Sequence, residues 1–128
     1  MRDNFYKILL TLLLALPLNG CALLLAGAVG GAGTSLWLSN KLVQEVDEPF
    51  PRSIKASKSA LKSLKLKLIQ ETQKEEVTQL RSEYFDGKAI WIDIHRLSDV
   101  KSRIEIRVGI SGDEVAARKI LEKIERYL

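Results

Sequence analysis

Few side chains in this sequence could do chemistry, and His95 is the first to consider. It is the only histidine of the chain, and Asp93 precedes it by two positions, so the two side chains would share one face of a strand. A carboxylate beside an imidazole can orient a proton, but nucleophilic catalysis also needs a nucleophile within hydrogen-bond reach. Gly109-Ile110-Ser111-Gly112 lacks the Gly-x-Ser-x-Gly pattern. We therefore expect His95 to be a structural or surface residue and the protein not to be an enzyme.

The spacing of possible ligands gives no support for a metal site. Zinc sites in proteins draw mostly on clusters of histidine and cysteine, and this chain has one of each. The paired acidic residues Asp47-Glu48 and Glu75-Glu76 are typical of solvated turns. We expect no metal and no cofactor.

Cys21, the only cysteine, is the second residue whose side chain could do chemistry. Arg2 and Lys7 give the chain a basic start, and residues 8–18 form an apolar run that ends before small Gly20. These are the features of a secretory signal. A lone cysteine cannot form an intramolecular disulfide, so an exported chain needs another use for it. The pattern predicts a signal peptide over residues 1–20.

Leu18-Asn19-Gly20-Cys21 resembles the cleavage and lipidation site of bacterial lipoproteins. Leu18, Gly20 and Cys21 match the pattern, and Asn19 stands where Ala, Ser or Thr is commoner. The resemblance implies cleavage before Cys21 and acylation of that cysteine, and more than one long acyl chain makes a stable membrane anchor. It also implies a periplasm-facing protein. Ala22, where Asp would favour the inner membrane, points to the outer membrane.

An uncleaved membrane span is the alternative, because apolar residues resume at Ala22 and a stretch of about 20 residues could cross a bilayer. Pro17, Asn19 and Gly20 interrupt that stretch.

Removing Arg2, Lys7 and Asp3 with the signal would lower the net charge from +4 to +3. This is not the basic footprint of a nucleic-acid binder, so we expect no nucleic-acid partner.

Residues 21–35 read as a lipidated cysteine followed by an Ala/Gly-rich tether, because glycine is costly in regular elements. Gly27-x-x-x-Gly31 leaves open a second interpretation, a closely packed helix face. A single small domain is expected over residues 36–128.

Within that domain, hydrophobic periodicity predicts strands and helices in alternation. Strands are expected over residues 36–48, 65–72, 77–85, 88–97 and 103–110. Polar residues 73–76 mark a turn, a bulge or a kink, so the second and third of these strands either form a hairpin or run on as one long bent strand. Asp86-Gly87 predicts a hairpin turn.

Two helices complete the predicted domain. One spans residues 52–64 with Ser53 as N-cap, and the other begins at Ser111, which with Glu114 fits a capping box. The inward positions of the last two strands are Ile90, Ile92, Ile94, Ile104, Ile106, Val108 and Ile110. The outward positions place Asp93 and His95 beside Arg103, Glu105 and Arg107, which predicts cross-strand charge pairs. The whole pattern predicts an α+β two-layer sandwich of order β-α-β-β-β-α, with a mostly antiparallel sheet and both helices on one face.

Lys55, Lys58 and Lys62 recur at helical spacing in the first helix. They are a candidate contact with an anionic surface such as lipid head groups. The other interpretation is an ordinary solvated helix face.

The layout is similar to a group of short bacterial lipoproteins assigned to a domain of unknown function. The matching features are the Leu-x-Gly-Cys at 18–21, the Ala/Gly-rich stretch after it, the Asp86-Gly87 hairpin, and the run 108–114 followed by 118–121. The resemblance implies an anchored envelope protein and no assigned activity.

Two functions from different classes remain. The first is a non-enzymatic interaction or accessory module with an envelope protein as partner. The alternative is a periplasmic domain that binds a lipid or other apolar ligand between helices and sheet, in a groove lined by Ile90, Ile92, Ile104 and Ile106. The oligomeric state is not predicted.

Overall fold

The computed structural model describes residues 4, 7 and 35–128. The predicted cleavage and lipidation residues Leu18, Gly20 and Cys21, and nearly all of the tether, lie outside the described residues. Residues 35–128 form a unit of their own. That unit is α+β, with two helices and one antiparallel sheet of six strands.

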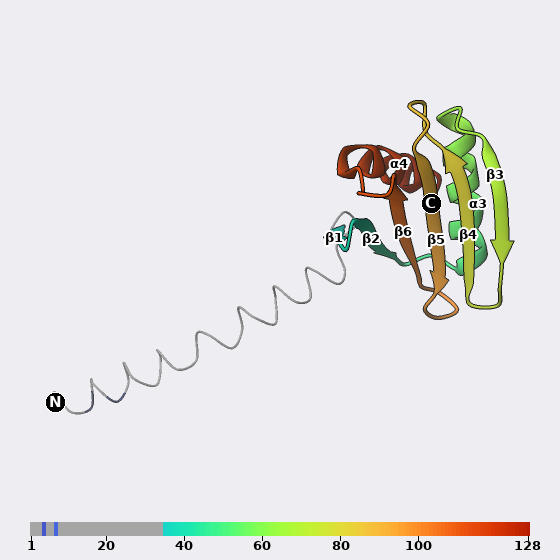
Figure 1. Ribbon diagram of the computed structural model, residues 1–128. Helices are drawn as coiled ribbons and strands as arrows, with labels where there is room; N and C mark the ends of the chain where they lie inside the picture. Colours follow the sequence, from blue (N-terminus) through green and yellow to red (C-terminus); the bar gives the residue numbers. More distant parts are fainter. Residues whose placement is uncertain (1–3, 5–6, 8–34) are drawn as a thin grey trace. The chain divides into compact units, whose positions relative to one another are not determined.

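The sheet follows the order β1-β2-β6-β5-β4-β3, and every neighbouring pair is antiparallel (Figure 1). β6 therefore pairs with its sequence neighbour β5 on one side and with β2, which comes much earlier in the chain, on the other. The strands are β1 (Leu36–Leu38), β2 (Lys41–Val46), β3 (Leu68–Gln73), β4 (Val77–Glu83), β5 (Ala89–Arg96) and β6 (Ser102–Val108).

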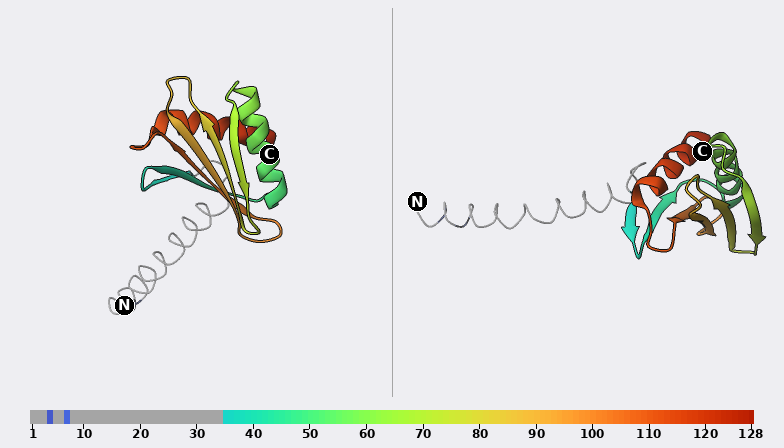
Figure 2. Two further views of the ribbon diagram at one scale, coloured as in Figure 1. Left: turned by 45° about the vertical axis from the view of Figure 1, so that its right-hand side comes forward. Right: turned by 45° about the horizontal axis from the view of Figure 1, so that its top comes forward.

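Both helices, α3 (Phe50–Ser63) and α4 (Glu114–Tyr127), lie on the same side of the sheet (Figure 2). The strand side chains that point to them are buried, and those of β5 and β6 are apolar except for Ser102, as alternation in these strands predicts. The core joins these strand residues to one stripe of each helix. Its largest fully buried members are Leu42, Leu61, Leu80, Ile90, Ile92, Ile94, Ile104, Ile106, Val108, Ile120 and Ile124.

The predicted first strand, residues 36–48, is instead the hairpin of β1 and β2. Ser39 and Asn40 form the turn between them with φ of 50° and 64°. Two consecutive left-handed residues are what a tight two-residue hairpin turn needs, and asparagine tolerates this conformation. The hairpin gives β2 a partner on its outer edge.

Helix α3 begins at Phe50, earlier than predicted, and Ser53 is not its N-cap. Pro49 takes the capping position with no side-chain bond, and Pro51 occupies the first turn, where its missing N–H costs nothing. Ser53 lies one turn inside the helix and is buried. Its Oγ is 2.5 Å from Oγ of Ser102 on β6, which in turn donates to the Glu48 carbonyl at 2.8 Å.

The two predicted strands on either side of residues 73–76 are separate. β3 and β4 form a hairpin, so the long bent strand is wrong and the turn is right. Lys65, which was expected to open a strand, has φ of 60° and directly follows Leu64, the C-cap of α3. The strand starts only at Leu68. The observed order is therefore β-β-α-β-β-β-β-α, with two strands more than the predicted order β-α-β-β-β-α.

The connection from β6 to α4 also differs from the prediction. Gly109 has φ of 74° and ends the strand, so Ile110, expected to point inward, is 90% exposed. Asp113, not Ser111, caps α4, and its Oδ1 accepts from the Ala116 backbone N–H at 3.1 Å. The predicted capping box is therefore wrong by two residues.

Candidate functional site

The face of the sheet opposite the helices carries the chemically diverse side chains of the domain. We call it the outer face. Its central part is formed by alternate residues of β5 and β6, all of them partly buried: Trp91, Asp93, His95, Arg103, Glu105 and Arg107. No described helix covers it (Figure 2). The sequence prediction that these residues point outward beside one another is confirmed.

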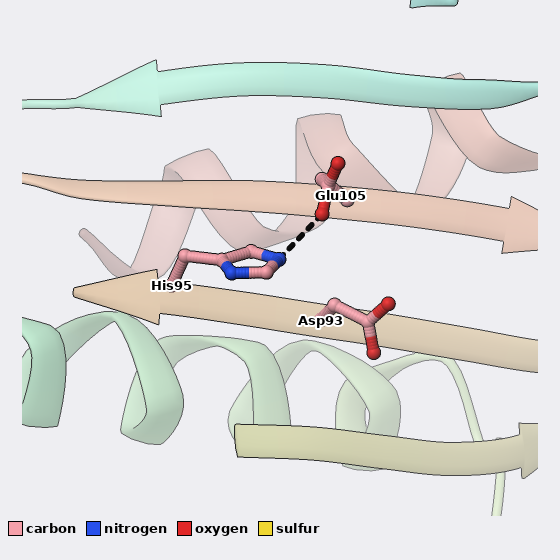
Figure 3. Close-up of side chains that lie close together, drawn as sticks. All are labelled: Asp93, His95 and Glu105. Carbon is pink, nitrogen blue, oxygen red and sulfur yellow. Dashed lines mark hydrogen bonds and ion pairs between the residues drawn. The ribbon is translucent and has the colours of Figure 1, made fainter. Parts of the chain in front are cut away.

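His95 and Glu105 form the closest contact of the outer face. Nε2 of His95 lies 2.5 Å from Oε2 of Glu105, and the two side chains are 29% and 16% exposed. The residues lie on neighbouring strands but are not directly opposite: His95 pairs with Arg103, and Glu105 pairs with Asp93. The contact is therefore diagonal, and Figure 3 shows the imidazole reaching from β5 toward β6.

Asp93 completes a group of three potential ligands. One donor atom each from Asp93, His95 and Glu105 lies within 4.8 Å of the other two. The carboxylate of Asp93 is also held from the other side, because Nε2 of Gln79 on β4 donates to its Oδ1 at 2.8 Å. We call Asp93, His95 and Glu105 the outer-face triad (Figure 3).

The arginines of the outer face do not pair with these carboxylates. The Arg107 guanidinium lies over the Trp91 ring, with Cζ 4.3 Å from the ring centroid. Among residues 35–128 no ion pair joins Arg103 or Arg107 to an acidic side chain, and the Nε atoms of both are buried without a hydrogen-bond partner there. Neither Arg103 nor Arg107 therefore neutralises the two carboxylates of the triad.

A shallow depression of about 220 Å³ opens beside the triad. Five charged or polar side chains and one aromatic ring line it: Lys41, Gln79, Asp93, Glu105, Arg107 and Trp91. Such a lining suits an ion or a small polar group, because an apolar ligand would leave these groups without water or a partner.

Sequence reasoning did not find the triad as a unit, although it placed all three side chains on one face. Asp93 and His95 were noticed because they are two residues apart, but Glu105 becomes their neighbour only through the pairing of β5 with β6. The available signal was the short connection between these strands, which fixes which residues of the two face each other. The prediction of no metal rested on the lack of a His/Cys cluster.

The structure does not gather Lys55, Lys58 and Lys62 into one set of free cations. Nζ of Lys58 is 2.6 Å from Oε2 of Glu71 on β3, so its charge is paired. Lys62 is exposed in the last turn of α3. Lys55 borders a hollow of about 490 Å³ shared with Arg52, Ser59 and Tyr127.

A second charged group lies at the loops before β5 and α4. Nζ of Lys88 is 3.3 Å from a carboxylate oxygen of Asp86 and equally far from one of Asp113. The bond to Asp113, then the one to Asp86, raises the pKa of Lys88. The backbone N–H of Ala116 lowers the pKa of Asp113, and that of Lys88 lowers the pKa of Asp86.

No helix among the described residues is long and apolar enough to cross a membrane.

Comparison with known proteins gives a family but no activity. A search of curated proteins finds no match. The family described as "Protein of unknown function (DUF3568)" matches residues 5–127, nearly the whole chain. The chain with the outer-face triad therefore belongs to the DUF3568 family, whose function is unknown.

Proposed function

We propose that this chain is a bacterial lipoprotein, anchored by acyl chains on Cys21 and facing the periplasm, most simply from the outer membrane. The sequence Leu18-Asn19-Gly20-Cys21 supports this, together with the absence of any second cysteine that Cys21 could pair with. A basic start and an apolar run precede it, as in secretory signals. Ala22 supports the outer membrane.

The length of chain between the anchor and the domain fits this proposal. The described unit begins at Ser35, which is 14 positions after Cys21. A fully extended chain spans at most about 3.3–3.6 Å per residue. The domain would therefore stay within about 50 Å of the lipid attachment.

Exposed apolar side chains near Ser35 also support a position close to a membrane. Leu36 and Leu38 on the edge strand β1 are 59% and 53% exposed. Ser35 itself accepts a hydrogen bond from Arg118 on α4 at 2.9 Å, and Val115, one turn earlier in that helix, is 67% exposed. Leu36 and Leu38 lie two positions apart and so share one face of β1, and neighbouring exposed apolar side chains are typical of protein or membrane contacts.

We further propose that the domain acts as a non-enzymatic interaction module for an envelope partner. The observation that carries this is the outer face, which no described helix covers and where cations and carboxylates alternate. β3 adds an exposed edge of six residues that could pair with a strand of another chain.

No observation favours the alternative of an apolar ligand held between helices and sheet. Ile90, Ile92, Ile104 and Ile106, which were expected to line such a groove, are fully buried in the core. A ligand would have to displace helix side chains that already fill this space.

The anchor is tested by the intact mass of the membrane-extracted protein, as wild type and as Cys21→Ala. The wild type should lack residues 1–20 and carry acyl mass, whereas Cys21→Ala should keep Met1 and carry none. A wild-type protein that keeps Met1 without acyl mass would show that the N-terminus is a membrane span instead.

The interaction module is tested by site-specific photo-crosslinking in intact cells. A photoreactive residue replaces Arg81, exposed on β4 where it pairs with Trp91, or Lys119, exposed on α4. We expect a discrete adduct from position 81 that is absent from position 119. Equal adducts at both positions, or none at position 81, would reject the outer face as the docking surface.

A further inference from the structure

We propose that the outer-face triad of Asp93, His95 and Glu105 is a binding site for a divalent transition-metal ion, with Zn²⁺ as the best match. The three donor atoms already lie within 4.8 Å of one another (Figure 3). The proposal is independent of the lipid anchor.

The strand geometry explains why these three residues can converge. Residues i and i+2 of a strand point to the same face, which places Asp93 and His95 side by side on β5. Glu105 approaches from the neighbouring antiparallel strand, where it is directly opposite Asp93. Two central strands of a sheet hold their side chains more rigidly than loops do, as a metal site requires.

The donor set selects the class of metal. One imidazole nitrogen and two carboxylate oxygens suit borderline ions such as Zn²⁺, whereas Ca²⁺ and Mg²⁺ prefer oxygen alone. Three protein ligands leave a further position for water or a partner's side chain. With bonds of about 2.0–2.2 Å, ligand atoms on tetrahedral zinc lie roughly 3.3 Å apart. Nε2 of His95 and Oε2 of Glu105, now 2.5 Å apart, need to separate by less than about 1 Å.

The charges around the triad leave a place for a cation. Like charges directly opposite each other on paired strands are destabilising, and Asp93 and Glu105 are such a pair. Arg107 stays over Trp91 instead of neutralising them. A bound divalent ion would relieve this repulsion. Lys41 and Arg107 border the same depression, so they limit the affinity to a moderate one.

Gln79 holds the metal ligand Asp93 in place by a hydrogen bond from outside the triad. Its Nε2 donates to Oδ1 of Asp93 at 2.8 Å, which leaves the second oxygen of the carboxylate for a metal. Residues that orient ligands in this way raise metal affinity.

The sole histidine makes the site easy to test on the full chain, extracted in mild detergent and purified with a tag that contains no histidine. Zn²⁺ is titrated by calorimetry, and the imidazole resonances of His95 are followed by NMR. We expect one ion per chain and a shift of the His95 resonances. His95→Gln and Glu105→Gln should each weaken binding at least about tenfold.

Glu45→Gln is the matched control. Glu45 is exposed on β2, where it pairs with Arg103 on the outer face. This variant therefore removes one negative charge from the outer face but outside the triad. It should bind Zn²⁺ as the wild type does. Binding that is equal in all variants, or that His95→Gln leaves unchanged, would overturn the proposal, as would the absence of binding by the wild type.

Two further measurements separate this inference from other causes. Circular dichroism of each variant without metal shows whether the sheet is intact, and Asp93→Asn offers a second ligand variant if one of the others unfolds. Cys21→Ala should bind Zn²⁺ normally, even if the lipid anchor proves wrong. Loss of binding in Cys21→Ala would assign the ion to the cysteine and reject the triad.

Discussion

Asp93 and Glu105 lie directly opposite each other on β5 and β6, and the adjacent pair on the same two strands is Ile92 with Ile106. The first pair is on the outer face and the second is fully buried. One register therefore sets both the core and the candidate site. A shift of β6 by one residue would bury Glu105 and expose Ile106, so the core itself keeps the triad assembled.

Gly112→Ala should destabilise the protein more than Gly87→Ala. Both glycines have a left-handed backbone, with φ of 80° and 89°, so both variants carry the backbone strain. A Cβ at Gly112 would also lie 2.7 Å from the Asn40 carbonyl oxygen, whereas the nearest atom to a Cβ at Gly87 is 3.8 Å away. Urea unfolding of both variants measures the difference. Equal losses would show that the loop before α4 moves freely away from the β1–β2 turn.

Ser102→Ala should cost about 1–3 kcal/mol of unfolding free energy. Its buried hydroxyl donates to the Glu48 carbonyl and contacts Oγ of Ser53, so its removal leaves buried polar groups without partners. Ser63→Ala, at an exposed position at the end of α3, is the control and should be near neutral. A small effect of Ser102→Ala in chemical denaturation would mean that water replaces the hydroxyl.

Ile104→Ala should lower the free energy of unfolding much more than Ile110→Ala, although both residues belong to the same apolar alternation in the sequence. Ile104 is fully buried, and its truncation should cost about 2–5 kcal/mol. Ile110 is 90% exposed, so its truncation should stay within about 0.5 kcal/mol. Thermal unfolding distinguishes them. A large loss for Ile110→Ala would place this side chain in a contact that the isolated domain lacks.

The ion pairs of Lys88 with Asp86 and Asp113 should make the free energy of unfolding depend on pH in both acidic and alkaline solution. Asp113 and Asp86 have lowered pKa values, so their contribution is present above the ordinary aspartate value of about 4 and is lost as pH falls below it. Lys88 has a raised pKa, so its contribution is present below about pH 10 and is lost as pH rises further.

Lys88→Met separates these two effects. The alkaline loss should disappear relative to the wild type. The acidic loss should remain in part, because the Ala116 N–H is the largest cause of the lowered Asp113 pKa. Urea unfolding between acidic and alkaline pH measures both. An unchanged alkaline loss in Lys88→Met would assign that loss to another lysine.

The central strands were predictable because their apolar residues alternate strictly. Ile90, Ile92 and Ile94 on β5 and Ile104 and Ile106 on β6 needed no other information to be placed inward, and all are buried. The Asp86-Gly87 turn between β4 and β5 was equally clear, since Gly87 has φ of 89°. Local periodicity and turn chemistry were sufficient for this part of the fold.

The errors occur where distant residues decide the local structure. Ser53 looked like an N-cap, but its hydroxyl contacts Ser102, 49 positions away. The turn at Ser39 and Asn40 was hidden in an apolar strand pattern. Cross-strand charge pairs between these strands were predicted, but the convergence of all three triad residues on one point depends on the register of β5 with β6. Periodicity assigns a side chain to a face but does not identify its neighbours on the next strand.

The shortness of β1 has a mechanical consequence for a chain held by its N-terminus. β1 is an edge strand with three paired residues, and among residues 35–128 only β2 pairs with it. Tension applied at Ser35 reaches the Leu36–Val43 pair first and opens the hairpin one pair at a time toward its turn. Releasing residues 36–40 would lengthen the tether by about 17 Å, while the five remaining strands and both helices keep their contacts. Such a pull would thus be taken up by β1 before it loads the core strands.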